Sequence, residues 1–403
     1  MQSSDNKTYS TKNKLSASAW LLILGIVFIA LTLRSPLTSV GPIIDEIRKA
    51  LHISNVAAGF ITTIPLLAFA IVSPIVPKIA RKITVEKSLL FATIILAIGI
   101  ALRSSGSISM LFIGTALIGI GISFGNVLLP SLIKLKFPLK VGIMTAIYTV
   151  AMNSSASLAA GVSYPISTLR YGWQGTLGIW IIFAILAIII WMPQTKNVQL
   201  EKPPTLAEQH EKKPMWRYPL AWIIMLAMGF QSMLFYTTAA WIPEMFKAQG
   251  LSAGQAGAMF SILQIAQIPM TFITPIIASK LKDQRPIVVF FGILYIIGFG
   301  GLLIGLTDYS ALWMICIGLA GGASFSTCMM FFSLRAKDAF ESADLSGFAQ
   351  SLGYLCAAIG PVLYGYIHDK YDSFDTANFM YIIVVIISVT ASFIAAKNRY
   401  VTG

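Results

Sequence analysis

One arginine lies inside an apolar stretch that is long enough to cross a lipid bilayer. Arg34 comes more than a dozen residues after Trp20, and a helical rise of about 1.5 Å per residue places it near the middle of the membrane. A charge at that depth costs several kcal/mol unless it faces water or a partner. Arg34 could therefore bind a polar or anionic solute in a cavity, pair with a buried carboxylate, or extend to the interface.

The acidic residues bear on these alternatives. All 16 Asp and Glu residues fall in expected loops or at expected helix ends, so no carboxylate is expected at the depth of Arg34. An unpaired cation in a cavity is a site for an anion, or at least a hydrogen-bonding anchor. We therefore favour substrate contact over a structural role. Thr38 lies one turn further along the same helix face and could shape the site.

Polar side chains in other expected spans could complete such a cavity. Their alternative role is to hydrogen-bond between membrane helices. Two pairs share a helix face: Gln264 with Gln267, and Gln350 with Tyr354. The candidate substrate-binding residues besides Arg34 and Thr38 are Asn126, Tyr148, Asn153, Gln231, Tyr236, Gln264, Gln267, Gln350 and Tyr354. Together they predict a polar, uncharged lining around one positive charge.

The sequence lacks the residues that several other functions require. No Gly-x-x-x-x-Gly-Lys-Ser/Thr run is present, so ATP hydrolysis is not expected. The three histidines lie outside the expected membrane core, which leaves no obvious proton carrier, although Glu244, Asp45 or Glu46 near the outer mouth could contribute. We find no catalytic constellation and no metal-ligand cluster, so the sequence predicts neither an enzyme nor a bound metal or cofactor.

Composition points to the bilayer as the solvent. Hydrophobic residues make up 56% of the chain and charged residues 11%, against about a quarter charged in soluble proteins. We predict an all-α membrane protein of about twelve spans, each of roughly 20 apolar residues. The expected spans are 18–45, 55–78, 86–104, 109–133, 141–166, 173–192, 218–244, 253–279, 286–306, 311–334, 343–367 and 375–396.

The chain reads as two pseudo-symmetric six-helix bundles. The polar stretch 193–217 predicts a cytoplasmic linker between bundles 1–192 and 218–403. Residues 121–124 (Gly-Ile-Ser-Phe) match residues 322–325 (Gly-Ala-Ser-Phe) at an offset that also pairs other positions of the two halves. Parallel six-helix repeats with a midplane site between them are a known transporter architecture.

The distribution of basic residues predicts the orientation of the chain in the membrane. With the N-terminus in the cytoplasm, 22 of the 29 Lys and Arg residues fall on the inner side and six on the outer side. The outer six are Arg48, Lys49, Arg103, Arg170, Lys247 and Lys370. This bias fits the positive-inside rule with both termini cytoplasmic, so the net charge of +13 indicates membrane orientation rather than nucleic-acid binding. We expect a monomer in a bacterial cytoplasmic membrane, with lipid and a small-molecule substrate as its partners.

The architecture resembles the major facilitator superfamily. Residues 77–82 (Pro-Lys-Ile-Ala-Arg-Lys) stand where that superfamily usually has Asp-Arg-x-Gly-Arg-Arg/Lys. The resemblance implies a gating loop of Lys78, Arg81 and Lys82, but Pro77 replaces the usual acid and leaves the usual gating ion pair in question.

A closer resemblance is to the cyanate permease family, which includes the 2-nitroimidazole transporters. The first-helix stretch 33–42 (Leu-Arg-Ser-Pro-Leu-Thr-Ser-Val-Gly-Pro) carries it, supported by 62–66, 125–130, 231–236 and 240–243. It implies secondary active or facilitative transport of a small anion or small polar organic solute by alternating access, with Arg34 as the leading binding residue.

Two other functions remain as alternatives. The first is a drug or metabolite exporter of the same superfamily, although residues 158–165 depart from the Gly-x-x-x-Gly-Pro run usual in span five of proton-driven drug antiporters. The second is a non-transporting membrane sensor or enzyme, for which the sequence offers neither a soluble domain nor catalytic residues.

Overall fold

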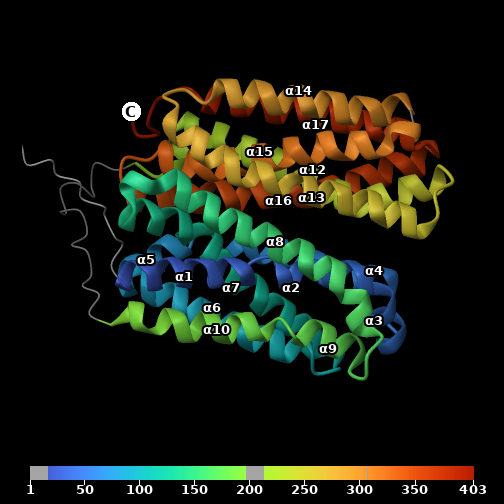
Figure 1. Ribbon diagram of the computed structural model, residues 1–403, viewed down its shortest axis with the longest axis horizontal. Coiled ribbons are helices and arrows are strands. Elements are labelled where there is room, and N and C mark those ends of the chain that lie inside the picture. Colours follow the sequence, from blue (N-terminus) through green and yellow to red (C-terminus); the bar gives the residue numbers. More distant parts are fainter. Residues whose placement is uncertain (1–16, 197–212, 306) are drawn as a thin grey trace, which may run out of the picture.

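The computed structural model describes residues 17–196, 213–305 and 307–403 (Figure 1). Every regular element in these ranges is a helix, which confirms the predicted all-α class. Residues 1–196 contribute α1 (Ala17–Thr32), α2 (Ser35–Thr38), α3 (Ile44–Leu51), α4 (Asn55–Val72), α5 (Val76–Ile83), α6 (Val85–Arg103), α7 (Ile108–Lys136), α8 (Val141–Ser167), α9 (Gly172–Gly178) and α10 (Ile181–Trp191). The remainder contributes α12 (Pro219–Ala248), α13 (Ala253–Lys280), α14 (Arg285–Ile304), α15 (Ser310–Leu334), α16 (Ala339–Tyr371) and α17 (Phe374–Ala395).

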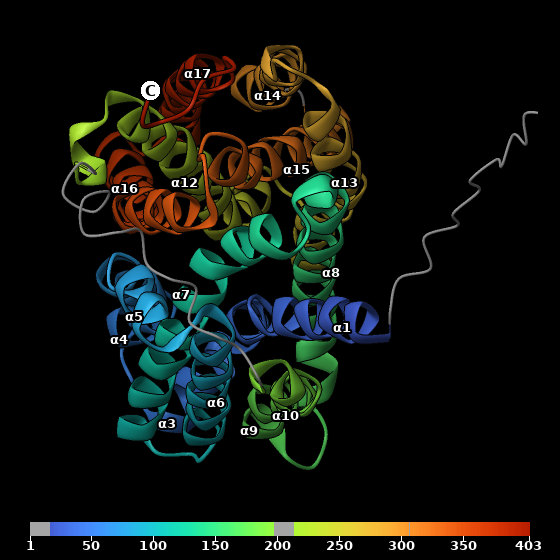
Figure 2. The same ribbon diagram turned by 90° about the vertical axis from the view of Figure 1, so that its left-hand side faces the viewer.

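The helices form two groups that lie side by side in both ribbon views (Figures 1 and 2). We call α1–α10 the N-terminal bundle and α12–α17 the C-terminal bundle. The groups touch where α4 and α7 pack on α16, and where α8 packs on α13. Residues 197–212, most of the predicted linker, lie outside the described residues.

Ten helical segments in the described ranges are long and apolar enough to cross a membrane. The predicted second span, 55–78, is not one straight helix: α4 and α5 meet at a 60° bend and add an eleventh span if taken together. The predicted fifth span corresponds to α8, whose 27 residues are long enough but are not among the apolar segments. Its centre carries Asn153, Ser154 and Ser155, which lower its hydropathy.

The predicted first span, 18–45, is also broken. Regular helix stops at Thr32 and restarts at Ser35, which leaves Arg34 with φ −124° and ψ −38°. Pro36 contributes to the break, because it has no N–H group to donate to the carbonyl of Thr32, four residues earlier, and so cannot continue the hydrogen bonding of α1. The carbonyl of Pro36 accepts a hydrogen bond of 2.7 Å from Nη1 of Arg103. Arg103, which was expected on the outer side near the end of the third span, is the last residue of α6 and is fully buried.

The two bundles are bonded to each other towards one end of the molecule, which we call the closed end. Lys134 Nζ of α7 donates to the carbonyls of Ser333 and Ala336, at 2.7 and 2.6 Å. Ser131 donates to the carbonyl of Ala339 at 2.6 Å. These bonds run from side chains of one bundle to backbone acceptors of the other, so they tie α7 to the ends of α15 and α16.

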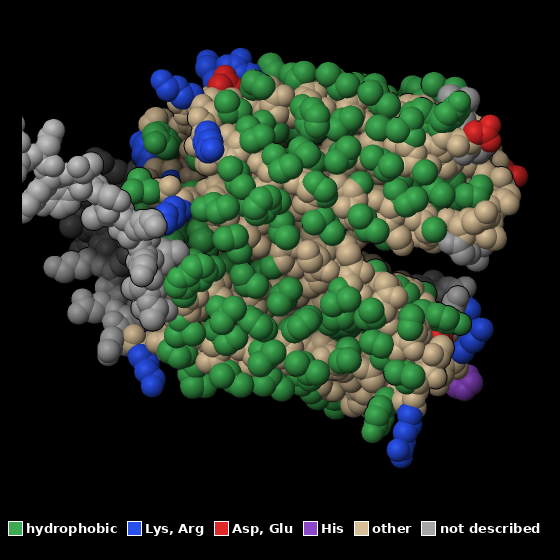
Figure 3. Space-filling view, viewed as in Figure 1, with side chains coloured by type: hydrophobic (Ala, Val, Ile, Leu, Met, Phe, Trp, Pro, Cys, Tyr) green, Lys and Arg blue, Asp and Glu red, His purple; other side chains and the backbone are tan. Residues whose placement is uncertain are grey.

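The opposite end, which we call the open end, carries the α3–α4 and α16–α17 connections (Figure 1). There the surface is hollowed between the two bundles, as the right-hand side of the space-filling view shows (Figure 3). The sides of both bundles in this view are densely covered by hydrophobic side chains, while charged groups gather at the two ends. This pattern suits helices whose sides face lipid.

We expect Lys134→Met to loosen the closed end, because it removes two charge-assisted bonds between the bundles. Spin labels at Lys140→Cys and Lys282→Cys, exposed positions at the closed end of each bundle, report the separation. The variant should gain a longer-distance population in pulsed electron spin resonance.

Lys136→Met is the matched control, because Lys136 pairs with Glu86 of its own bundle at 2.9 Å. It should leave the distance distribution unchanged. Identical distributions for Lys134→Met and the unsubstituted protein would rule out this role for Lys134.

Candidate functional site

The break between α1 and α2 presents Arg34 to the C-terminal bundle. Its guanidinium carbon lies 5.0 Å from the ring centre of Phe235 on α12 and 5.1 Å from that of Phe325 on α15. Both distances fall within the range of cation–π attraction. Arg34 is only partly buried, and its side chain has no hydrogen bond or ion pair to another described residue. The aromatic rings therefore stand where a carboxylate would usually stand.

An aromatic cluster surrounds this charge. The rings of Tyr236 and Tyr354 are 6.5 Å apart, and Tyr354 lies 4.8 Å from Phe69 of α4. Tyr236 in turn lies 5.3 Å from Phe235, one of the two rings beside Arg34. The structure thus brings together Arg34, Tyr236 and Tyr354, which the sequence offered only as separate candidates.

Phe69, Phe235 and Phe325 were not predicted from the sequence. Phenylalanines are ordinary residues of membrane helices, so their type carries no signal of a site. Phe325 offered a clue, since it ends the 322–325 run that matches residues 121–124 in the other half.

Helix α8 carries two of the expected residues, Tyr148 and Asn153, and contacts a third, Thr38 of α2. The Thr38 hydroxyl donates a 3.0 Å bond to the carbonyl of Ala156, which fixes α2 against α8. The Tyr148 hydroxyl and the Asn153 amide nitrogen are buried and have no hydrogen-bond partner among the described residues. Both groups therefore keep an unused hydrogen-bonding position in the described chain.

Gln350 of α16 reaches across to the N-terminal bundle. Its Nε2 donates to the backbone carbonyl of Asn126 at 2.9 Å and to the Ser346 hydroxyl at 2.7 Å. Its Oε1 is buried without a partner in the described part of the chain. Asn126 was expected to offer its side chain, but the contact that the structure records is through its backbone.

The glutamines of α13 are arranged differently. Gln267 Nε2 donates to Gln264 Oε1 at 2.6 Å, and both side chains are buried. The Gln267 side chain also lies beside Gly321 of α15, where a Cβ would stand 3.7 Å from its Cδ. This pair fits the alternative of polar contacts between packed helices. Gln231 is buried one turn before Phe235 on α12, and its amide oxygen accepts a long, 3.4 Å bond from Ser232.

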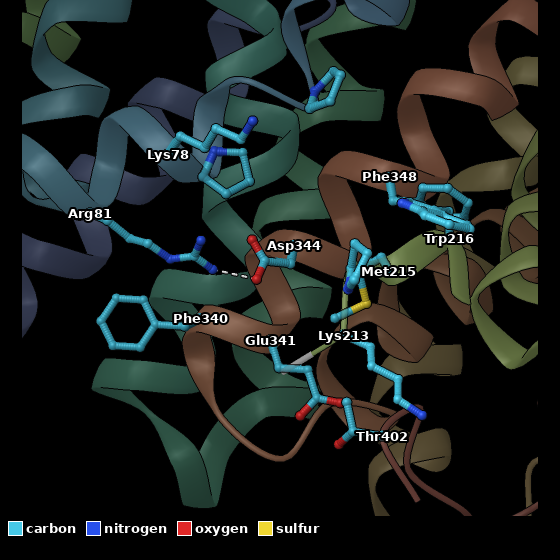
Figure 4. A pocket seen from close by; sticks show the side chains of 13 residues that line it. Lys78, Arg81, Lys213, Met215, Trp216, Phe340, Glu341, Asp344, Phe348 and Thr402 are labelled. Atoms are coloured by element: carbon cyan, nitrogen blue, oxygen red, sulfur yellow. Dashed lines mark hydrogen bonds and ion pairs between the residues drawn. The ribbon is translucent and has the colours of Figure 1, made fainter. Parts of the chain in front are cut away.

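The expected gating residues, Lys78, Arg81 and Lys82, lie at the closed end of the molecule. Arg81 forms an ion pair with Asp344 of α16 (Figure 4), so a partner from the other bundle replaces the acid that position 77 lacks. Lys78 and Arg81 line a cavity of about 570 Å³ between the bundles, together with Trp216, Phe348 and others. Lys82 is exposed and does not line it. Sequence reasoning did not find Asp344, because the pairing crosses the two halves.

No group of three or more His, Cys, Asp or Glu side chains that could hold a metal ion occurs in the described ranges. The residues around Arg34 are aromatic, amide and hydroxyl groups. Such a set can bind a small solute through an arginine, hydrogen bonds and ring stacking, and it lacks a nucleophile paired with a base.

Comparison with known proteins agrees with this reading. Residues 20–361 match the family model of the Major Facilitator Superfamily. The chain is 44% identical to the uncharacterized transporter YycB of Bacillus subtilis (strain 168), over 96% of each chain. It is 39% identical to a 2-nitroimidazole transporter of Escherichia coli (strain K12), over 89% of this chain and 90% of the relative. Identity to the cyanate transport protein CynX of the same organism is 23%, over 84% and 88%.

The fold matches solved transporters as well. The proton:xylose symporter XylE bound to 6-bromo-6-deoxy-D-glucose superposes with a TM-score of 0.76 at 16% identity, over 95% of this chain and 97% of that structure. At that identity the likeness concerns the fold alone. Sequence, fold and site chemistry together assign the chain: it belongs to the Major Facilitator Superfamily, in the family of the 2-nitroimidazole and cyanate transporters, and is a transporter of small solutes rather than an enzyme.

Proposed function

We propose that this transporter moves a small anion or a small polar organic solute, of the nitroimidazole or cyanate kind, and that Arg34 is its principal binding residue. One observation carries the proposal: Arg34 faces the other bundle with no acceptor for its N–H groups among the described residues. The printed functions of two relatives, 2-nitroimidazole and cyanate transport, supply candidate solutes.

The chemistry of guanidinium suits this role. Arg carries five N–H donors in one plane and stays charged at any physiological pH. Phe235 and Phe325 attract its charge but accept no conventional hydrogen bond. A nitro or carboxylate group offers two oxygens in one plane, which match two of those donors. Tyr236, Tyr354 and Phe69 then provide aromatic surface for the rest of the solute.

Transport by alternating access would use the two bundles as moving units. In this proposal residues 1–192 and 218–403 rock about the Arg34 site, with 193–217 as the linker. The closed end carries exposed basic residues such as Lys78, Lys82 and Lys282. By the positive-inside rule, this supports a cytoplasmic location for the closed end and both termini. The state described here then faces outward. All of these residues come from one chain, and we propose a monomeric carrier.

To release the solute on the other side of the membrane, the two bundles must separate at the closed end. The Arg81–Asp344 pair and the Lys134 bonds would have to break, while the open end closes over the solute. Because the bonds of Lys134 go to backbone carbonyls and those of Arg81 lie near the surface, water can replace each of them as the bundles part.

The aromatic lining also favours a second candidate, export of aromatic compounds. A resistance test separates the two: cells overproducing an exporter should survive higher concentrations of a toxic nitroaromatic compound, whereas an importer should make them more sensitive.

We predict that Arg34→Ala lowers uptake of labelled 2-nitroimidazole into proteoliposomes by about 100-fold. The reason is the loss of two charge-assisted hydrogen bonds of about 1.5 kcal/mol each. Arg34→Lys keeps the charge but loses the planar pair of donors, so it should retain a small part of the activity.

Arg170→Ala removes an exposed arginine at the open end and serves as the control. It should transport normally. Normal uptake by Arg34→Ala, with the protein present in the membrane at an unchanged level, would refute the assignment of Arg34.

We also predict that Phe235→Leu and Phe325→Leu each raise the KM for uptake by about two- to fivefold, because a cation–π contact contributes about 0.5–1 kcal/mol. Phe379→Leu, at an exposed position of α17, is the control and should leave the KM unchanged. An unchanged KM in both test variants would show that the rings do not hold Arg34 in place.

A further inference from the structure

Gln350 has an amide orientation that its contacts determine. The nitrogen and oxygen of a glutamine amide have similar shapes, and their assignment rests on hydrogen-bond partners. The partner across the bundles is the backbone carbonyl of Asn126, which can only accept. The atom facing it must therefore be the NH₂ group, and Oε1 must point elsewhere.

That Oε1 is a buried acceptor without a donor among the described residues. The Gln350 side chain as a whole has no exposed surface. A buried polar atom without a partner costs about 1–3 kcal/mol. Gln264 shows the contrast, since its Oε1 accepts the Gln267 bond.

Gln350 is tied to the Arg34 site from two sides. On α16 it lies one turn before Tyr354, whose ring is 6.5 Å from that of Tyr236 in the aromatic cluster around Arg34. On α7 its partner Asn126 follows Gly125, where a Cβ would stand only 2.4 Å from Cδ2 of Leu33. Leu33 is the residue next to Arg34, so α7 packs directly on the helix break.

We propose that Gln350 Oε1 accepts a hydrogen bond from an N–H group of the solute, and that the substrate class is small heteroaromatic compounds with a ring N–H and an acceptor substituent. The acceptor substituent binds Arg34, and the ring N–H binds Gln350. This inference rests on the proposed role of Arg34 and adds a requirement for a donor. Cyanate has no N–H group, so it lacks the second contact.

The requirement predicts discrimination between close analogues. A site built to hydrogen-bond a donor rejects the analogue that lacks it, because the acceptor is then left unpaired. N-methylation of 2-nitroimidazole removes the ring donor and keeps the nitro group. Methylation at ring carbon 4 adds the same volume and keeps the donor, so it controls for size.

The test measures inhibition of labelled 2-nitroimidazole uptake by 1-methyl-2-nitroimidazole and by 4-methyl-2-nitroimidazole in proteoliposomes. For the unsubstituted protein we expect the N-methyl compound to bind at least about 10-fold more weakly than the C-methyl compound. Equal inhibition by the two compounds overturns the proposal. This comparison uses only the unsubstituted protein, so its result does not depend on whether a variant folds.

The second arm uses Gln350→Met, which removes the acceptor at similar volume. The ratio of the two inhibition constants should fall towards one in this variant and stay unchanged in Gln264→Met. A ratio that survives in Gln350→Met also overturns the proposal.

Different experimental results would refute the proposed function and the proposed role of Gln350. Normal uptake by Arg34→Ala would refute the proposed function. Loss of uptake in Arg34→Ala, together with an unchanged ratio in Gln350→Met, would remove only the role of Gln350.

Discussion

The placement of a partly buried cation without an ion pair in the described chain is the constraint on which the arrangement around the helix break depends. Arg34 lies within the membrane-spanning part of the chain, and a carboxylate is missing from its surroundings in the described structure. The charge is tolerated because the α1–α2 break turns it towards the space between the bundles, where Phe235 and Phe325 attract it. Pro36 contributes to that break, and Arg103 and Thr38 fix it against α6 and α8. The position of Arg34 thus depends on contacts with both bundles.

The candidate polar residues of the spans differ in whether all their buried polar atoms have hydrogen-bond partners. Gln264 and Gln267 satisfy each other, which is what packing between helices requires. Tyr148, Asn153 and Gln350 each keep a buried polar atom without a partner in the described chain. Soluble and membrane proteins alike avoid such atoms unless a ligand or water completes them. The α13 pair therefore has the contacts of a packing pair, whereas Tyr148, Asn153 and Gln350 each keep an unused hydrogen-bonding position in the described chain.

The closed end shows how the bundles can hold together without a permanent interface. Its bonds run largely from side chains to backbone carbonyls, and Lys134 lies at the carboxyl end of α15, where a cation is favoured by the helix dipole. The Arg81–Asp344 pair, whose side chains are 36% and 28% exposed, adds little stability by itself. Many weak contacts of this kind suit an interface that forms and separates in each transport cycle.

The sequence by itself determined the helical membrane class and identified Arg34, because hydropathy and the cost of a buried charge are local properties of the chain. It also found Tyr236, Tyr354, Tyr148 and Gln350 as polar residues within apolar spans. Only the tertiary structure decided which of them meet Arg34, since contacts between α2, α12 and α16 depend on packing over hundreds of residues. For the same reason Phe235, Phe325 and Asp344 were not predicted. A phenylalanine or a surface acid becomes part of a site only through the neighbour that folding brings to it.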